Sequence, residues 1–166
     1  MSEGVEIKLP TSVITRLDIA RAVTELEQVG AGLTTASIQS QVGVETQWQP
    51  STSEQLGALL ELNPFDLHDV RQREEFTHSL RQLKEAAPVV HMTFSGPADG
   101  ESLRELIQWL RESVHPQAVI QVGLQPELVG GVYVRTKNHV HDLSLRARLA
   151  GHRHLITEQV EALRAE

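Results

Sequence analysis

The sequence lacks cysteine, which excludes disulfide bonds and thiolate chemistry and is consistent with a cytoplasmic protein. It also lacks any apolar run that approaches the roughly 20 residues needed to cross a bilayer. The segment 1–10 is too polar for a signal peptide. We therefore expect any membrane association to come through a partner protein.

A surplus of basic residues is absent as well. Lysine and arginine number 15 against 22 aspartates and glutamates, giving a formal net charge of −7, which argues against nucleic acid as a main partner. Residues 1–87 hold 7 basic and 13 acidic residues, whereas residues 88–166 hold 8 and 9, so the acidic excess lies in the first half. With 166 residues, 40% of them apolar, the chain is expected to be globular, as one ordinary domain or two small ones.

The first half is predicted to be helical. A helix is expected from Ser12 to Val29, ended by Gly30 and Gly32. One apolar face at helical spacing comprises Ile19, Ala22, Val23, Leu26 and Val29. A second face, on the opposite side, comprises Val13, Leu17 and Ala20. Two interpretations stay open: the helix is packed on both sides in a bundle, or the second face is free to bind an incoming helix.

Further helices are expected before residue 88. Ser51 and Glu54 have the spacing of a capping box, and Asn63 with Pro64 is expected to begin the next helix. The buried face of that helix is predicted to comprise Phe76, Leu80, Leu83 and Ala87. Residues 1–87 are therefore interpreted as a small bundle of three or four helices.

The second half is predicted to mix strands and helices. Residues 89–95 and 118–124 alternate as two strands, and an amphipathic helix lies between them, begun by Asp99 or Ser102. This order suggests a crossover that places the two strands side by side or as near neighbours. Trp109, on the helix, is expected in the core or partly in it.

Two later features complete the second half. The strand 129–135 is expected to form a hairpin with the strand before it, and Asp142 to cap a final helix. Residues 88–166 are therefore interpreted as a C-terminal domain with a small mixed sheet and two helices. The whole chain is predicted to be of the α+β class.

No pattern for catalysis, a cofactor or a metal emerges from the sequence. His139 and His141 share a strand face, but His152 and His154 are two apart and diverge around a helix, so a convergent zinc site is not expected. Ser144 is expected inside a helix that Asp142 caps, whereas a catalytic serine lies on a sharp turn with backbone donors, so Ser144 is not expected to be a nucleophile. The glycine pair at 130–131 lacks the spacing of a nucleotide-binding loop.

One long ordered pattern is specific. Gly-Gly-Val-x-Val-Arg precedes Val-x-Asp-x-Ser-x-Arg-x-Arg-Leu, with the marked positions Gly130, Gly131, Arg135, Asp142, Ser144, Arg146 and Arg148. This pattern resembles the C-terminal signature of the delta subunit of F-type ATP synthases, whose mitochondrial homologue is the oligomycin-sensitivity-conferring protein. The resemblance is clearest from Pro88 onward. Leu143 and Ala147 stand where many family members have glycine.

The resemblance implies a function and partners. It implies a non-catalytic stator subunit of the peripheral stalk, which links the alpha/beta head to the b subunit, on the cytoplasmic side of the membrane. The helical half would bind N-terminal segments of alpha through Val13, Leu17 and Ala20. The C-terminal half would bind the C-terminal region of b through Ile156, Val160 and Leu163, which continue an apolar stripe from Leu145 and Leu149.

Alternatives to this interpretation stay open. In the docking interpretation, Leu145 and Leu149 pack on the sheet and the later residues of the stripe protrude. The stripe could instead pack back on the helical bundle and merely join the two halves. Because the first half is short for a delta subunit, the chain could be a free-standing adaptor or regulator that keeps only the C-terminal fold. A small enzyme using the histidine, aspartate and arginine cluster is the third class considered.

Overall fold

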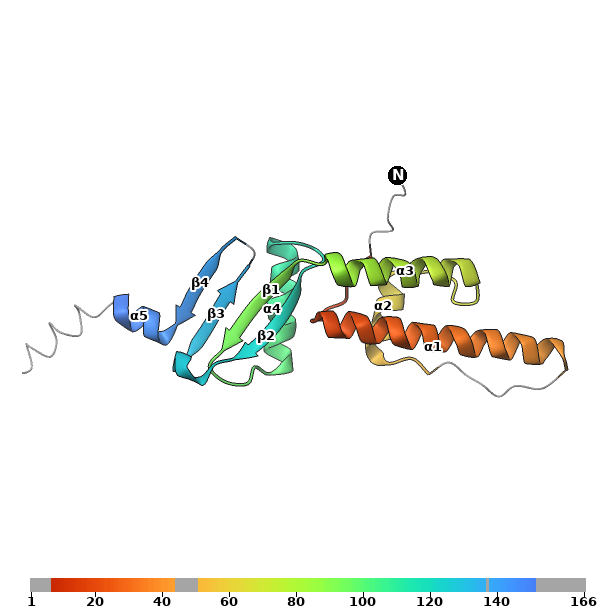
Figure 1. The fold of residues 1–166 in the computed structure, drawn as a ribbon, viewed down its shortest axis with the longest axis horizontal. Helices are drawn as coiled ribbons and strands as arrows, with labels where there is room; N and C mark the ends of the chain where they lie inside the picture. Colours follow the sequence, from red (N-terminus) through yellow and green to blue (C-terminus); the bar gives the residue numbers. More distant parts are fainter. Residues whose placement is uncertain (1–6, 44–50, 137, 152–166) are drawn as a thin grey trace, which may run out of the picture. The chain divides into compact units, whose positions relative to one another are not determined.

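The computed structural model describes residues 7–43, 51–136 and 138–151 (Figure 1). The elements in chain order are α1 (Arg16–Gln41), α2 (Glu54–Leu62), α3 (Val70–Ala86), β1 (Val89–Phe94), α4 (Gly100–Ser113), β2 (Val119–Leu124), the 3-10 turn η1 (Pro126–Leu128), β3 (Gly131–Arg135), β4 (Val140–Ser144) and α5 (Leu145–Gly151). A helical first part followed by a sheet with helices confirms the predicted α+β class. The chain forms two compact units, one of residues up to 88 with 103–119 and one of 89–102 with the residues from 120. The division into domains 1–87 and 88–166 stays a prediction.

Helix α1 is longer than predicted at its C-terminal end. Thr15, not Ser12, is the N-cap, and Thr15 and Asp18 form a reciprocal capping box. The expected end at Gly30 is wrong, because the helix continues through both glycines and buries Gly30 with the apolar face. The end is set instead by Gly43, whose φ of +78° favours glycine and takes the chain out of the helix. The predicted face with Ile19, Ala22, Val23, Leu26 and Val29 is buried, as expected.

Helices α2 and α3 begin later than the sequence pattern suggested. Ser53, not Ser51, caps α2, and the carboxylate of Glu25 on α1 accepts hydrogen bonds from the Ser53 backbone N–H and hydroxyl. Asn63 does not begin α3, because its side chain is engaged with the backbone of Lys8 and it ends α2. Helix α3 is capped by Asp69. The predicted buried face of α3 is confirmed for Phe76, Leu80, Leu83 and the following Ala87.

The segment before α1 is fixed to the C-terminal part of α4 by Arg111. Its guanidinium donates to the carbonyls of Leu9 at 3.1 Å, Pro10 at 2.7 Å and Val13, and also to the carbonyl of Ala118. Burial lowers the pKa of Arg111 to about 10, but the group stays protonated at neutral pH. One arginine thus satisfies carbonyls that regular structure leaves unpaired.

The start of α4 agrees with the prediction, whereas its tryptophan does not. The Asp99 carboxylate accepts a 2.8 Å hydrogen bond from the Ser102 backbone N–H. Hydrogen bonds from Ser102, its backbone first and its hydroxyl second, lower the pKa of Asp99. Trp109 was expected in the core or partly in it, but it is 57% exposed, because the buried stripe of α4 runs through Ile107 and Leu110.

The sheet has four strands in the order β2-β1-β3-β4. Strands β1 and β2 are parallel, because Val119 N–H donates to Pro88 and Gln125 N–H donates to Phe94, so partners advance in the same direction. The β1–β3 and β3–β4 pairs are antiparallel, which makes the sheet mixed, as predicted. The expected hairpin of β3 with β2 is wrong. After η1 and Val129, which has a left-handed φ of 63°, the chain joins the other edge of β1, and β3 forms its hairpin with β4.

Candidate functional site

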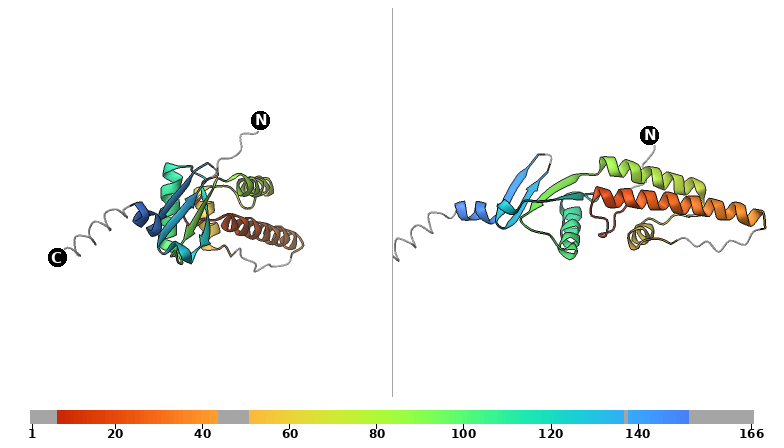
Figure 2. Two further views of the ribbon diagram at one scale, coloured as in Figure 1. Left: turned by 60° about the vertical axis from the view of Figure 1, so that its left-hand side comes forward. Right: turned by 60° about the horizontal axis from the view of Figure 1, so that its bottom comes forward.

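A groove of about 690 Å³ lies between α1 and α3, which run side by side (Figures 1 and 2). We call it the α1–α3 groove. Its lining residues come from these two helices only: Leu26, Glu27, Gly30, Ala31, Thr34, Val70, Arg73, Glu74, Thr77, His78 and Arg81. The mixture of aliphatic, charged and hydroxyl side chains suits a peptide segment better than a small apolar ligand.

Arg73 of α3 crosses the groove toward α1. The residue is only 7% exposed. Its guanidinium donates to the Leu67 carbonyl at 2.6 Å and to the Thr34 hydroxyl at 3.5 Å. The Arg73 side chain can lie against α1 because residue 30 is glycine: a Cβ at Gly30 would lie 2.7 Å from Nε of Arg73. The close approach of the two helices at this point therefore depends on a missing side chain.

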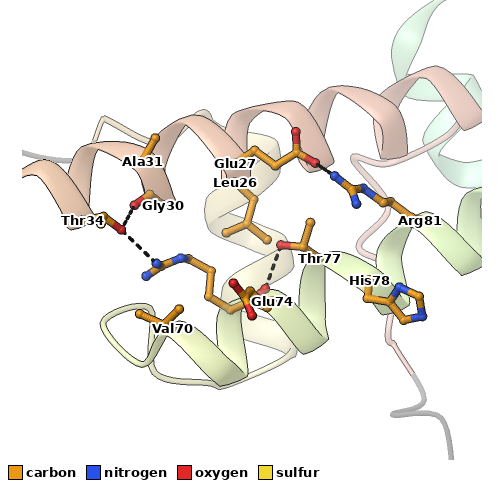
Figure 3. A pocket seen from close by; sticks show the side chains of 11 residues that line it. Leu26, Glu27, Gly30, Ala31, Thr34, Val70, Glu74, Thr77, His78 and Arg81 are labelled. Carbon is orange, nitrogen blue, oxygen red and sulfur yellow. Dashed lines mark hydrogen bonds and ion pairs between the residues drawn. The ribbon is translucent and has the colours of Figure 1, made fainter.

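An ion pair joins the two walls at the other end of the groove. Glu27 on α1 and Arg81 on α3 are hydrogen-bonded, as Figure 3 shows. Both side chains are substantially exposed, so the pair contributes little to stability. The Thr34 hydroxyl donates a hydrogen bond to the Gly30 carbonyl, and the Thr77 hydroxyl donates one to the Arg73 carbonyl, each within its own helix. The walls are thus rigid helices with polar groups already oriented.

The residues predicted to bind alpha lie in different environments. Val13 precedes α1 and is buried, at 1% exposure, whereas Leu17 is 58% exposed and Ala20 is intermediate. At 100° per residue, Leu17, Ala31 of the groove and the exposed Ile38 fall within about 60° of arc on α1. Leu17 and Ala20 thus share one side of α1 with Ala31 of the groove, whereas Val13 precedes the helix and is buried.

Sequence reasoning missed the groove because it ended α1 at Val29. The groove needs the next turns of the helix, which carry Gly30, Ala31 and Thr34. A usable signal was present: the pattern of alanine, threonine and serine after Gly32 has no proline and is compatible with a continuing helix. The partner arginine could not have been found, since nothing in the sequence pairs residue 73 with residue 30.

The signature residues form the junction of β3, β4 and α5. Gly131 has a φ of +91°, and a Cβ there would lie 2.4 Å from the Leu143 carbonyl oxygen. The carbonyl of Gly130 accepts a 2.8 Å hydrogen bond from the N–H of Leu145, the first residue of α5. The glycine pair therefore lets β3 pass directly against the end of β4.

Ser144, and not Asp142 as predicted, caps the last helix. Asp142 does not cap the last helix. It lies in β4, and Ser144, which is fully buried, is the residue whose hydroxyl accepts the Ala147 N–H at 3.2 Å at the start of α5. Asp142 accepts a 3.0 Å hydrogen bond from Ser144 N–H. Hydrogen bonds from Ser144, its hydroxyl first and its backbone second, lower the pKa of Asp142, and the Arg146 charge adds to this.

The remaining predicted site residues lie near this junction or outside the described residues. Arg135, Arg146 and Arg148 are exposed. Leu145 and Leu149, predicted to pack on the sheet, are 45% and 49% exposed, and the Leu145 side chain lies beside Gly130, next to β3. Ile156, Val160 and Leu163, the predicted b-binding residues, lie outside the residues that the structure describes.

Two further observations concern metals and membranes. The rings of His139 and His141 stack with centroids 6.2 Å apart. Within the described ranges, no group of three histidine, cysteine, aspartate or glutamate side chains could hold a metal ion. Among the described helices, none combines the length and the apolar character needed to cross a membrane.

Comparison with known proteins finds several ATP synthase delta subunits. No protein-family model matches the chain. The delta subunit of ATP synthase from Cupriavidus pinatubonensis is 36% identical over 77 residues, which are 46% of this chain and 42% of that protein. The delta subunits from Burkholderia pseudomallei (35% over 78 residues, 47% of this chain and 43% of that protein) and Neisseria meningitidis serogroup C (32% over 79 residues, 48% and 42%) are also similar. The matched stretch thus spans less than half the length of these curated relatives. Over about half of its length, the chain is similar to ATP synthase delta subunits, which confirms the family resemblance predicted from the sequence.

Proposed function

We propose that this chain is a non-catalytic subunit of an F-type ATP synthase and acts in the peripheral stalk, on the cytoplasmic side of the membrane. The observation that carries the proposal is the similarity to delta subunits over about half of the chain. The signature residues support a non-catalytic role. The described ones form a junction between strands and a helix and are not arranged as a catalytic site. In this role the chain resists torque between the catalytic head and the b subunit, while other subunits carry out ATP synthesis.

The proposed partner of the helical half is an N-terminal segment of the alpha subunit. The strip of α1 with Leu17, Ala20, Ala31 and Ile38 supports this, because Leu17, Ala31 and Ile38 are exposed and Ala31 also lines the α1–α3 groove. An amphipathic helix can lay its apolar face along such a strip, using residues three and four apart. Val13 is buried, so in this proposal it does not touch the partner.

The proposed partner of the C-terminal half is the C-terminal region of the b subunit. The half-exposed leucines of α5, at positions 145 and 149, support a docking surface that continues toward Ile156, Val160 and Leu163. Deleting the chain from Thr157 onward tests this part. We expect the shortened protein to stay folded and to lose b; unchanged affinity for b would contradict the assignment.

Co-purification with its own alpha and b subunits tests the proposal as a whole. We expect the tagged full chain to retain both subunits, and to restore ATP-driven ion pumping to membrane vesicles from which the resident delta subunit has been removed. The isolated chain should hydrolyse no ATP. Pumping that stays uncoupled after addition of the folded chain would contradict the stalk assignment.

A free-standing adaptor is the second candidate. It is favoured by the short match, which covers 42% of the Cupriavidus pinatubonensis delta subunit. An adaptor would bind neither alpha nor b, or only one of them, and would leave pumping unchanged. The same co-purification experiment therefore distinguishes the two functions.

A further inference from the structure

The charge of Arg73 is unmatched within the described part of the chain. Both hydrogen-bond partners of its guanidinium, the Leu67 carbonyl and the Thr34 hydroxyl, are neutral. No described carboxylate lies within 4.0 Å of its guanidinium, and the neighbouring groove residue Glu74 forms no ion pair with it. At 7% exposure this is an uncommon state for an arginine, because buried charges are normally paired.

The α1–α3 groove is shaped to accommodate this arginine. Gly30 lies inside α1, where glycine lowers helix stability by about 1 kcal/mol relative to alanine. Alanine at this position would collide with Nε and Cδ of Arg73, at 2.7 and 3.1 Å. In contrast, a Cβ at Gly57 of α2 would meet nothing within 4 Å. The glycine at position 30 is therefore explained by the Arg73 side chain, which occupies the space that a Cβ would need.

The second arginine of the groove provides a contrast. Arg81 is 59% exposed at its side chain and already paired with Glu27. A ligand carboxylate would gain little there, since the charge is screened and satisfied. At Arg73 the same carboxylate would meet a desolvated guanidinium with a fixed position, where charge-assisted hydrogen bonds are strong.

We propose that Arg73 binds an aspartate or glutamate side chain of a peptide segment docked in the α1–α3 groove. The proposal rests on the proposed function in one respect, namely that the segment is an N-terminal part of alpha. The groove volume of about 690 Å³ accommodates a few side chains of such a segment. Ala31 and Val70 line the groove at exposed positions and would contact apolar residues flanking the acid. The ligand is thus an amphipathic, acidic segment, and the acid sets its register.

A double-mutant cycle on the full-length protein tests this. The probe is a fluorescent peptide of the alpha N-terminal segment, made as the natural sequence and with each Asp or Glu changed in turn to Asn or Gln. The protein variants are Arg73→Gln and Arg73→Lys, with Arg81→Gln as the matched control from the same groove. Circular dichroism and urea unfolding establish that each variant is folded.

We expect Arg73→Gln to weaken binding of the natural peptide by roughly 10- to 100-fold, as for the loss of a desolvated charge pair. Arg73→Lys should weaken it less, because the charge is kept and the planar fork is lost. Arg81→Gln should change affinity by less than about threefold. For one of the neutralised peptides, the affinity for the wild-type chain should be as low as the affinity of the natural peptide for Arg73→Gln. The affinity of that same peptide should fall little further when the protein carries Arg73→Gln.

Three outcomes decide the matter. Coupling between residue 73 and a single peptide acid supports the proposal. If the effects of the protein and peptide changes simply add for every acid, Arg73 has only a structural role and the proposal is wrong. If no peptide binds the wild-type chain, the alpha assignment under the proposed function fails, which is a different result. Should Arg73→Gln not fold, the Arg73→Lys arm and the peptide series on the wild-type chain decide in the same way.

Discussion

Replacing Gly131 by alanine should destabilise the sheet strongly, whereas the same change at Gly130 should not. At Gly131 the φ of +91° disfavours any L side chain, by about 1–2 kcal/mol. The new Cβ would also lie 2.4 Å from the Leu143 carbonyl oxygen and 2.9 Å from the Ser144 Cα. Since both are backbone atoms, β3 and β4 must separate, which weakens one or two ladder hydrogen bonds of about 1 kcal/mol each. We expect a total loss of about 3 kcal/mol.

Gly130 is the matched control from the same motif. A Cβ there would lie 3.6 Å from the Leu145 Cβ, an ordinary contact, and its φ is outside the left-handed region. Gly130→Ala should therefore change the free energy of unfolding by less than about 1 kcal/mol, in either direction.

Urea unfolding followed by circular dichroism measures both variants of the glycine pair. Amide hydrogen exchange in β3 and β4 shows whether the loss at Gly131 is local. Equal stabilities of the two variants would refute the assignment of the motif to a close backbone approach.

Other consequences of the structure can be tested in the same way. Arg111→Met removes the donors that hold the segment before α1 and should lower the free energy of unfolding by about 3 kcal/mol; the exposed Arg104→Met on the same helix is the control, and similar losses for both would contradict the role of Arg111. Glu25→Gln removes the charge beside the N-terminus of α2 and should cost about 0.5–1 kcal/mol, less at high salt; a loss that salt does not reduce would point away from electrostatics. Leu17→Asp should weaken binding of the alpha N-terminal peptide and leave circular dichroism nearly unchanged, since the side chain is 58% exposed; unfolding would mean that this face is core.

The sequence assigned many of the site residues to helices or strands, but it did not predict which of them lie in contact. The signature residues were recognised at their positions because the order Gly-Gly to Arg-Leu is long and local. The role of Gly131 was not predictable in detail, since the carbonyl that it approaches belongs to Leu143, on another strand. Likewise, the cap of α5 moved from Asp142 to Ser144 because β4 extends through residue 144 and pairs with β3.

What the sequence determined by itself is the set of local features. Periodicity identified the buried faces of α1 and α3 and the strand β1, because each depends on spacing along one element. Tertiary structure decided the rest. Strand β3 joined β1 and not β2, and α1 ran on through Gly30, because the partner surfaces come from segments far away in the chain. The same reason applies to the groove. Gly30 and Arg73 come into contact only because α1 and α3 pack side by side, and no local sequence pattern predicts that packing.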